Sequence, residues 1–552
     1  MTFLNPIIES IIPFTLLLGI LVFVHEMGHF LVARACGVRV EVFSLGFGKK
    51  IFSFKKGDTV YCVSLIPLGG YVKMFGEQPA EAKENVLSDE DKKVSFTHKT
   101  VWQRIAIVSA GPLMNFLFAI LIFGFISYTG EETRAARIAE VTENSIAAQA
   151  GLKPQDLILS VNGNNVRSFE EFQKQLNIYQ NSDIKLVVQQ NSEASREISV
   201  AVKTILNPNI FSSQKMSGQI EGLLPYGKGT LVAVKFDSTS YRSGFKTGDE
   251  IIKINDRALR NWTDLGQLLA SDKAVITVSR SVDKSKKNEN VEIIFTNIQA
   301  NKPKSVEDLG FEHPELYLEQ VVPGSPAAKA DLKSFDKIVS INGVPMKIWE
   351  NVLNTIKSYD EKDALNVVIS REGTEILKKI TPEMTSQMTV QGKEDKRFTV
   401  GILAMANISQ PELITIKEDN LFAATAKGFN RSWDISVMTV MSFIRLFQGE
   451  VSHKNIGGLI SIGKAAKDSY AMGAQTFLMT MGILSISLFI LNLLPVPVLD
   501  GGHLVFYVIE IVKGSPLSVK KMELAHQIGF ALLMGLMVLA LFNDFTKFLF
   551  KS

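Results

Sequence analysis

Four long apolar stretches constrain the fold of this chain more than any other feature of its sequence. They lie at residues 7–36, 105–128, 472–500 and 524–543. Each is near the ~20 residues that an α-helix needs to cross the hydrocarbon core of a bilayer. With 552 residues, 46% of them hydrophobic, the chain is also larger than one ordinary domain. The sequence therefore predicts a multi-pass α-helical membrane protein with about four spans, for which the lipid bilayer is a partner.

The first stretch contains an HExxH motif in an otherwise uncharged apolar run, formed by His25, Glu26 and His29. Residues four apart share one face of a helix, so the two imidazoles can bind one metal ion. In HExxH hydrolases the glutamate acts as general base toward water. Ionisable side chains in hydrocarbon are costly unless they are paired or metal-bound. This favours a metal site over a pair of satisfied core histidines.

A third ligand is expected elsewhere, because a hydrolytic zinc normally has three protein ligands and one open position. Asp500 is the strongest candidate, since it ends a charge-free stretch that follows Asp468. Pro495 and Pro497 remove backbone donors and break the helix near its end, which lets the carboxylate turn toward the metal. Taken alone, this segment would be a helix-ending turn.

The two motifs together resemble the site-2 protease family of intramembrane zinc metalloproteases, whose signature is an HExxH in one span and an LDG in a later one. Residues 109–116 look like the family's second span, and residues 67–74 look like its re-entrant β-loop. One departure is Leu459 after Gly458, where the family pattern has proline, so the turn there is expected to differ.

The resemblance implies a zinc peptidase site. His25, His29 and Asp500 would bind Zn²⁺, and Glu26 would take a proton from water and return it to the leaving amine. Asn492, carried over from the family motif, would hold the substrate or the oxyanion, or cap the broken helix.

A substrate-binding strand is expected in the loop 37–100. A transmembrane helix hides each scissile carbonyl in a hydrogen bond, so it must unwind before cleavage, and an edge strand can accept the unwound segment. Alone, residues 60–75 would pass as an ordinary hairpin beside the membrane. The residues expected to contact substrate are Pro67, Leu68, Gly69, Gly70, Tyr71 and Val72.

The positions of the lysines predict the orientation in the membrane. Lysines cluster in the loop 37–100 and recur at Lys513, Lys520 and Lys521, so both loops are expected to be cytoplasmic. The long segment between the second and third spans then lies outside. For a bacterial family member this implies the inner membrane, periplasmic modules and an active site near the cytoplasmic side.

The composition excludes two other classes of function. Cys36 and Cys62 both fall in or beside the expected cytoplasmic loop, so neither disulfides nor redox chemistry are expected. A net charge of +3 on this length gives no reason to expect a nucleic-acid partner.

The outer segment carries an internal repeat, in which residues 151–163 return as 244–256 and as 331–343. Each copy has a turn, an acidic residue that opens a short β-branched strand, and an Asn-centred hairpin turn, which predicts a compact β-rich module. The copies resemble PDZ domains of bacterial proteases, and Asp256, in place of the last glycine, makes the middle copy the most divergent. The expected modules span residues 135–205, 220–298 and 314–384.

Two roles are open for these modules. PDZ domains capture an extended peptide as an added edge strand, but here they could equally act as a steric filter over the membrane site. Asn162, Asn255 and Asn342 are expected to be turn residues rather than contacts.

An apolar stripe at three- and four-residue steps runs from Phe422 to Phe447 and predicts an amphipathic helix over residues 418–448. This helix is expected either to lie on the outer membrane surface, with Trp433 at the interface, or to pack on the modules.

The resemblance implies cleavage within transmembrane segments of single-span proteins that were already trimmed outside, such as an anti-sigma factor, or of remnant signal peptides. A membrane zinc transporter and an inactive PDZ-bearing scaffold are the alternatives. Transport would predict further intramembrane acids. An inactive scaffold would be expected to have lost Glu26, which is present.

Overall fold

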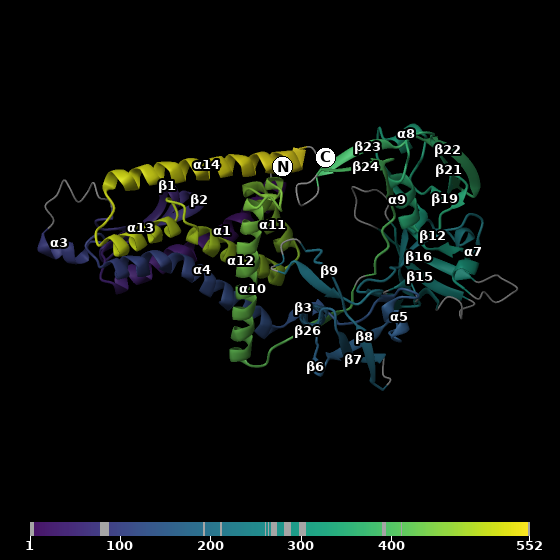
Figure 1. Ribbon diagram of the computed structural model, residues 1–552, viewed down its shortest axis with the longest axis horizontal. Helices are drawn as coiled ribbons and strands as arrows, with labels where there is room; N and C mark the ends of the chain where they lie inside the picture. Colours follow the sequence, from purple (N-terminus) through teal and green to yellow (C-terminus); the bar gives the residue numbers. More distant parts are fainter. Residues whose placement is uncertain are drawn as a thin grey trace.

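The computed structural model has a group of long helices on one side and three β-rich modules on the other (Figure 1). It describes residues 5–77, 88–190, 194–209, 212, 214–259, 261, 262, 264–266, 273–280, 289–296, 305–388, 394–409 and 411–549.

Four of the described helices are long and apolar enough to cross a membrane. Their ends differ by a few residues from the predicted spans. The second begins at Val101 rather than at 105, because Thr100 and Gln103 form a capping box that satisfies its first backbone donors. The four helices are α1 (Asn5–Ala35), α4 (Val101–Thr129), α12 (Ala474–Leu493) and α14 (Val519–Leu549).

Helix α11 (Leu459–Ala471) explains the departure from the family pattern. Asp544 of α14 caps its start by accepting hydrogen bonds from the backbone of Gly458, Ile460 and Ser461 at 3.0 to 3.1 Å. The cap does not need the N–H of Leu459, the first helical residue. Leucine and proline therefore both fit this position, since the first N–H of a helix has no partner within the helix.

Strands β1 (Val40–Lys56) and β2 (Thr59–Met74) form one antiparallel sheet that folds back on itself. Phe43 of β1 pairs with Tyr61 on one side and with Val72 on the other. The two strands thus supply four strand segments, and the segment that contains Val72 lies at an edge. No other strand among the described residues pairs with that edge.

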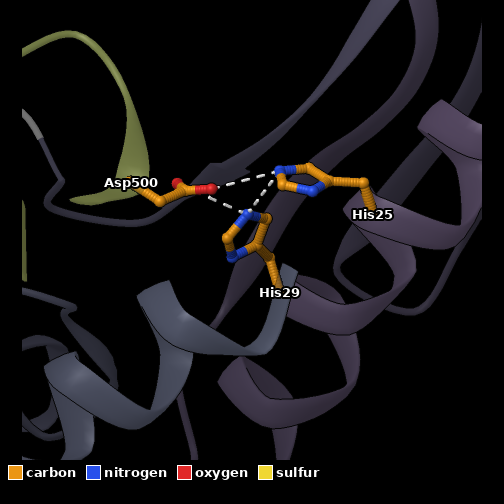
Figure 2. A group of neighbouring side chains, drawn as sticks. All are labelled: His25, His29 and Asp500. Atoms are coloured by element: carbon orange, nitrogen blue, oxygen red, sulfur yellow. Dashed lines mark hydrogen bonds and ion pairs between the residues drawn. The ribbon is translucent and has the colours of Figure 1, made fainter. Parts of the chain in front are cut away.

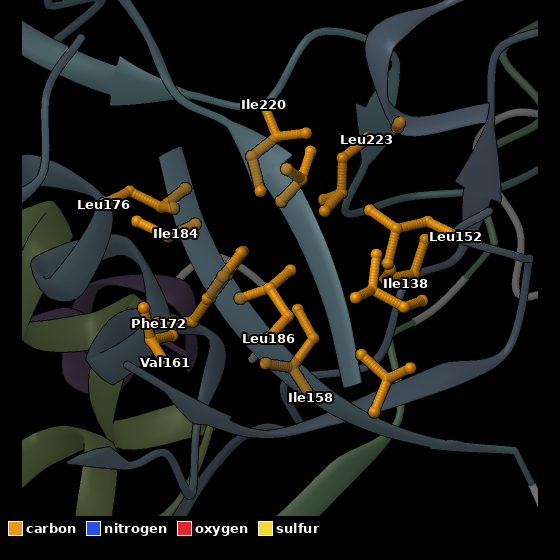
Figure 3. Packing of buried hydrophobic residues seen from close by; sticks show 14 of the residues in the cluster. Ile138, Leu152, Ile158, Val161, Phe172, Leu176, Ile184, Leu186, Ile220 and Leu223 are labelled. Carbon is orange, nitrogen blue, oxygen red and sulfur yellow. The ribbon is translucent and has the colours of Figure 1, made fainter. Parts of the chain in front are cut away.

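Three β-rich modules contain the three sequence repeats (Figure 1). The first has the sheet order β6-β5-β7-β8, with α6 (Phe169–Ile178) packed on it, and Figure 3 shows its core. The third repeats this arrangement as β20-β19-β21-β22 with α9 (Trp349–Lys357), and the second follows the longer path β16-β15-β13-β12-β17. The strands are β5 (Asp156–Val161), β6 (Asn164–Asn165), β7 (Asp183–Gln190), β8 (Arg196–Ala201), β12 (Leu231–Val234), β13 (Asp249–Ile254), β14 (Arg257–Ala258), β15 (Lys273–Arg280), β16 (Glu289–Thr296), β17 (Phe311–Glu312), β19 (Lys337–Ile341), β20 (Val344–Pro345), β21 (Leu365–Arg371) and β22 (Thr374–Ile380).

The same ion pair recurs in all three modules. The acidic residue that opens each repeat's strand is fully buried or nearly so and meets an arginine at 2.5 to 2.7 Å. Each repeat's asparagine has a positive φ of 46° to 50°, as expected for a left-handed turn residue. The pairs are Asp156–Arg196, Asp249–Arg280 and Asp336–Arg371, and the turn residues are Asn162, Asn255 and Asn342.

The modules extend beyond the boundaries expected from the repeats. The core of the first includes Ile220 and Leu223, well past residue 205, and the core of the second includes Phe311, past residue 298. Returning strands complete these cores, and a short repeat cannot reveal strands that lie outside it.

Smaller strand pairs and short helices connect these parts. Strand β3, directly after α4, pairs with β26, shortly before α10, so the chain enters and leaves the module region at one place. The pairs are β3 (Glu131–Arg134) with β26 (Leu413–Ile416), β4 (Glu140–Val141) with β11 (Leu223–Leu224), β9 (Lys203–Leu206) with β10 (Met216–Gln219), β18 (Leu318–Val321) with β25 (Ile402–Ala404), and β23 (Glu383–Met388) with β24 (Glu394–Thr399). The short helices are α3 (Asp89–Val94), α5 (Ile146–Gln149), α7 (Thr239–Arg242) and α8 (Pro326–Lys329).

Helix α10 (Leu421–Phe447) packs on α4 and α12 mainly through small residues, and of its aromatic stripe Phe429 lies edge-on to Phe116 of α4, with ring centroids 6.2 Å apart. Gly428 lies so close to α4 that an added Cβ would be 2.5 Å from the carbonyl oxygen of Ile120. Phe422 and Trp433 of the stripe stay 81% and 57% exposed. The spans are therefore the main packing partners of α10, which also meets the first module through the exposed ion pair Lys174–Asp434 at 3.6 Å, and most of the stripe remains free to meet lipid.

Candidate metal centre

His25, His29 and Asp500 converge on one point (Figure 2). Nε2 of His25 lies 3.2 Å from Nε2 of His29 and 3.2 Å from Oδ2 of Asp500, and Nε2 of His29 lies 3.6 Å from Oδ1 of Asp500. All potential ligand atoms fall within 4.8 Å of one another. The two histidines come from α1, and Asp500 is the first residue of α13 (Asp500–Lys513).

Two glycines let Asp500 reach this point. After α12 ends, the chain turns tightly through residues 494–499 before α13 begins. An added Cβ on Gly501 would lie 2.3 Å from the carbonyl oxygen of Leu494, and one on Gly502 would lie 2.3 Å from that of Val496. Only glycine therefore allows the start of α13 to fold back onto the turn.

Helix α13 is fixed to α4 by Arg104. Its guanidinium binds the carboxylate of Glu510 in a bidentate manner, at 2.6 and 3.2 Å, and lies 4.9 Å from the ring centroid of Tyr507. Such a pair, mostly shielded from solvent, adds geometric specificity. It holds the helix that begins with Asp500 against the helix that packs on the HExxH motif.

His29 has its ring orientation fixed by α4. Its Nδ1 donates to the carbonyl oxygen of Ile107 at 2.9 Å, which fixes the ring with Nε2 directed at the cluster. An added Cβ on Gly111 would lie 2.2 Å from Nε2 of His29, so this glycine provides the room for the ring. The segment 109–116 forms the wall behind the metal ligand.

His25 has two asparagines beside its other ring nitrogen. Nδ2 of Asn492 and Nδ2 of Asn115 each lie 3.4 Å from Nδ1 of His25. Asn492 was expected near the site from the sequence. Asn115 lies within residues 109–116, which the sequence indicated only as a span motif, and no local pattern indicates that a residue of α4 contacts His25.

Glu26 lies between the histidines and the free edge of the β-sheet. Its carboxylate accepts a hydrogen bond from the backbone N–H of Val72. An added Cβ on Gly70 would lie 3.0 Å from Cγ of Glu26. Gly70, Tyr71 and Val72 therefore lie along the strand beside the general-base candidate, and Pro67 to Gly69 precede them in the same strand.

The donor set fits zinc. Two imidazole nitrogens and one carboxylate oxygen are ligands that Zn²⁺ accepts in catalytic sites, where a fourth position stays open. Because both Nε2 atoms and the Asp500 carboxylate face one another, one cation placed among them would contact all three side chains. A separate cavity of about 1490 Å³ lies between the second and third modules and is lined by none of these residues.

Comparison with known proteins gives consistent matches along the chain. The model of peptidase family M50 matches residues 13–536. The regulator of sigma-E protease RseP of Salmonella typhimurium is 31% identical over 98% of this chain and 99% of its own, and that of Escherichia coli is 30% identical over 97% and 98%. A protein of Pasteurella multocida named as a zinc metalloprotease is 31% identical over 98% and 99%.

A solved PDZ domain protein of Parabacteroides distasonis is 12% identical over 48% of this chain and 95% of its own, with a TM-score of 0.13. At that score the likeness carries no information about the fold of this chain.

Proposed function

This chain belongs to peptidase family M50 and is an intramembrane zinc metalloprotease, and from that premise we propose which of its residues perform the reaction. The observation that supports the assignment is the convergence of His25, His29 and Asp500 beside Glu26, between helices long and apolar enough to cross a membrane. In this proposal the first three residues hold the metal and Glu26 is the catalytic base.

Each residue has a separate task. When bound, Zn²⁺ supplies a Lewis acid that polarises the scissile carbonyl and activates water. Glu26 takes a proton from the attacking water and returns it to the leaving amine. The hydrogen bond from Val72 orients the Glu26 carboxylate, and Asn492 contributes a polar side chain on the substrate side of His25.

The substrate is proposed to bind as an added strand. The free edge of β2 runs past Glu26, so an unwound substrate segment paired with it would present its scissile carbonyl to the cluster. The residues assigned to this contact are Pro67, Leu68, Gly69, Gly70, Tyr71 and Val72.

For the orientation we propose the bacterial inner membrane, with the modules in the periplasm and the active site near the cytoplasmic side. The lysine-rich loop between α1 and α4 supports this placement. The three modules are proposed to be PDZ-like, with the divergent copy in the middle, and to filter substrates by size or to bind extended peptides.

For the substrate class we rely on the relatives that are named regulators of sigma-E protease. We propose that this chain cleaves a single-span anti-sigma factor after its outer part has been removed, and thereby acts in an envelope stress response. Remnant signal peptides are a second class with the same single-span chemistry.

Two variants test the residue assignment, because Glu26 and Asp500 have different tasks in one site. Glu26→Gln keeps the shape and all three ligands, so it should retain zinc and lose cleavage. Asp500→Ala removes a ligand, so it should lose zinc as well. Both would be purified in detergent, their zinc measured, and cleavage of a single-span substrate assayed.

Normal cleavage by Glu26→Gln, or full zinc content in Asp500→Ala, would overturn the assignment. A zinc transporter would behave differently, since Glu26→Gln would leave metal flux intact.

A further inference from the structure

Asn115 is a buried polar side chain that the proposed reaction does not use. It lies in α4, is 0% exposed, and directs its amide at Nδ1 of His25. Its Oδ1 is buried without a partner among the described residues. A buried amide oxygen without a hydrogen bond is unfavourable and calls for an explanation.

The tautomer of His25 supplies that explanation. A histidine that binds a metal through Nε2 carries its proton on Nδ1, and that N–H is almost always given to an acceptor. With Nδ2 of Asn115 facing Nδ1, two donors would meet while Oδ1 stays unused. The two ends of an amide are told apart only by their hydrogen bonds. If the side-chain amide of Asn115 is rotated by half a turn, its Oδ1 accepts the hydrogen bond from Nδ1–H of His25, and both atoms are satisfied.

His29 follows the same rule. Its Nδ1 already donates to the carbonyl oxygen of Ile107, also in α4. One helix thus faces the second ring nitrogen of both histidines, through a backbone oxygen for His29 and a side-chain amide for His25.

Asn492 is less suited to this task. It approaches Nδ1 of His25 at the same 3.4 Å, but its side chain is partly exposed, and its oxygen is not among the buried atoms without a partner. Asn115 is fully enclosed, and its own backbone oxygen is fixed by the hydroxyl of Ser485 at 2.7 Å. Asn492 therefore remains available for substrate.

We propose that Asn115 is a positioning residue whose Oδ1 accepts a hydrogen bond from Nδ1 of His25 and thereby holds Nε2 of His25 toward the metal. This inference rests on the proposed zinc site, and it assigns to the second span a share in metal affinity.

Two substitutions separate an acceptor from a donor at this position. Asn115→Leu has a similar size and removes the acceptor, so it should weaken zinc binding about 10- to 100-fold. Asn115→Asp keeps an oxygen acceptor and removes the donor, so its zinc affinity should stay within a few-fold of wild type. If Asn115 instead donated to Nδ1, the aspartate would repel the ring lone pair and bind zinc as weakly as leucine.

The measurement is chelator competition for zinc with the full chain in detergent, together with the visible spectrum of the Co²⁺-substituted protein, which reports the ligand geometry directly. Ser485→Ala is the control, because it removes a hydroxyl that contacts only the backbone oxygen of Asn115 and not its amide, so it should leave affinity and spectrum unchanged. Thermal unfolding of each variant shows whether it folds. If the leucine variant does not fold, the zinc affinity of the aspartate variant still shows whether Asn115 accepts or donates the hydrogen bond.

Wild-type affinity in Asn115→Leu, or an aspartate variant as weak as the leucine variant, would overturn the inference. Asp500→Ala distinguishes a wrong role for Asn115 from a wrong assignment of the whole metal centre. If that variant also keeps its zinc, the metal centre itself is misassigned, whereas a loss confined to Asp500→Ala contradicts only the role of Asn115.

Discussion

Glycines at the metal centre set the distances between backbones that bear its ligands. Gly28 brings α1 against α4, since an added Cβ would lie 2.3 Å from the carbonyl oxygen of Ala110. Gly111 makes room for the ring of His29, and Gly501 makes room for the turn before Asp500. Small residues allow such close approach in membrane bundles, where packing rather than hydrophobic burial drives association. A larger residue at these positions would displace the backbones that bear the histidines and Asp500, so the glycines are as necessary for the arrangement as those side chains.

Gly111→Ala adds one methyl group and tests whether this glycine provides the room that the His29 ring needs. The new Cβ would lie 2.2 Å from Nε2 of His29, so the ring must rotate away from the cluster. We expect zinc content to fall and cleavage to fall at least about tenfold, as for loss of an outer-shell contact. The matched control is Gly19→Ala in α1, where an added Cβ meets nothing within 4 Å. Equal zinc in both variants, measured on purified protein, would contradict the steric argument.

At the scale of elements, the free edge of β2 is the feature that links fold to substrate. Val72 pairs with Phe43 of β1 and also donates its backbone N–H to Glu26. The edge and Glu26, the proposed catalytic base, are thus held together, and a bound strand would be aligned with Glu26 by the sheet itself.

Val72→Pro removes the N–H that Val72 gives to Glu26 and also places a proline ring on the edge where a substrate strand would pair. If the edge holds unwound substrate, stable transmembrane helices should suffer most, with cleavage slowed about five- to tenfold more than for helices destabilised by glycine or proline. Loss of the hydrogen bond to Glu26 would slow all substrates by one factor, so the ratio between substrates isolates the strand. The same slowing for stable and unstable helices would show that substrate does not pair here.

The elements also show where sequence reasoning stops. The convergence of His25, His29 and Asp500 was predictable, because the spacing of four on a helix is local and the acid ends an apolar run. The double pairing of Phe43 was not, since it depends on a strand returning from far along the chain. In α10 the aromatic stripe was conspicuous, yet small residues such as Gly428 make the closest contact with α4, because close helix packing favours residues without a side chain.

At the scale of the whole molecule, the modules form an insertion whose two ends meet. β3 leaves α4 and β26 leads into α10, and they pair with each other along Glu131–Arg134 and Leu413–Ile416. Arg431 of α10 also binds Glu131 at 2.6 Å, which fixes this junction to the helices. The pairing of β3 with β26 therefore holds the end of α4 near the start of α10, without help from the modules.

This geometry allows a clean test of the modules. Replacing residues 136–410 with a short glycine–serine linker keeps β3, β26 and their pairing, and removes Ala136 and Ile138, which belong to the core of the first module. If the modules act as a size filter, the shortened protein should retain zinc and should cleave substrates that still carry their outer domain, which the full chain leaves intact. The assay compares trimmed and untrimmed forms of one single-span substrate. If the modules are needed to recognise substrate, the shortened protein should bind zinc normally yet cleave neither form, and that result would exclude the filter.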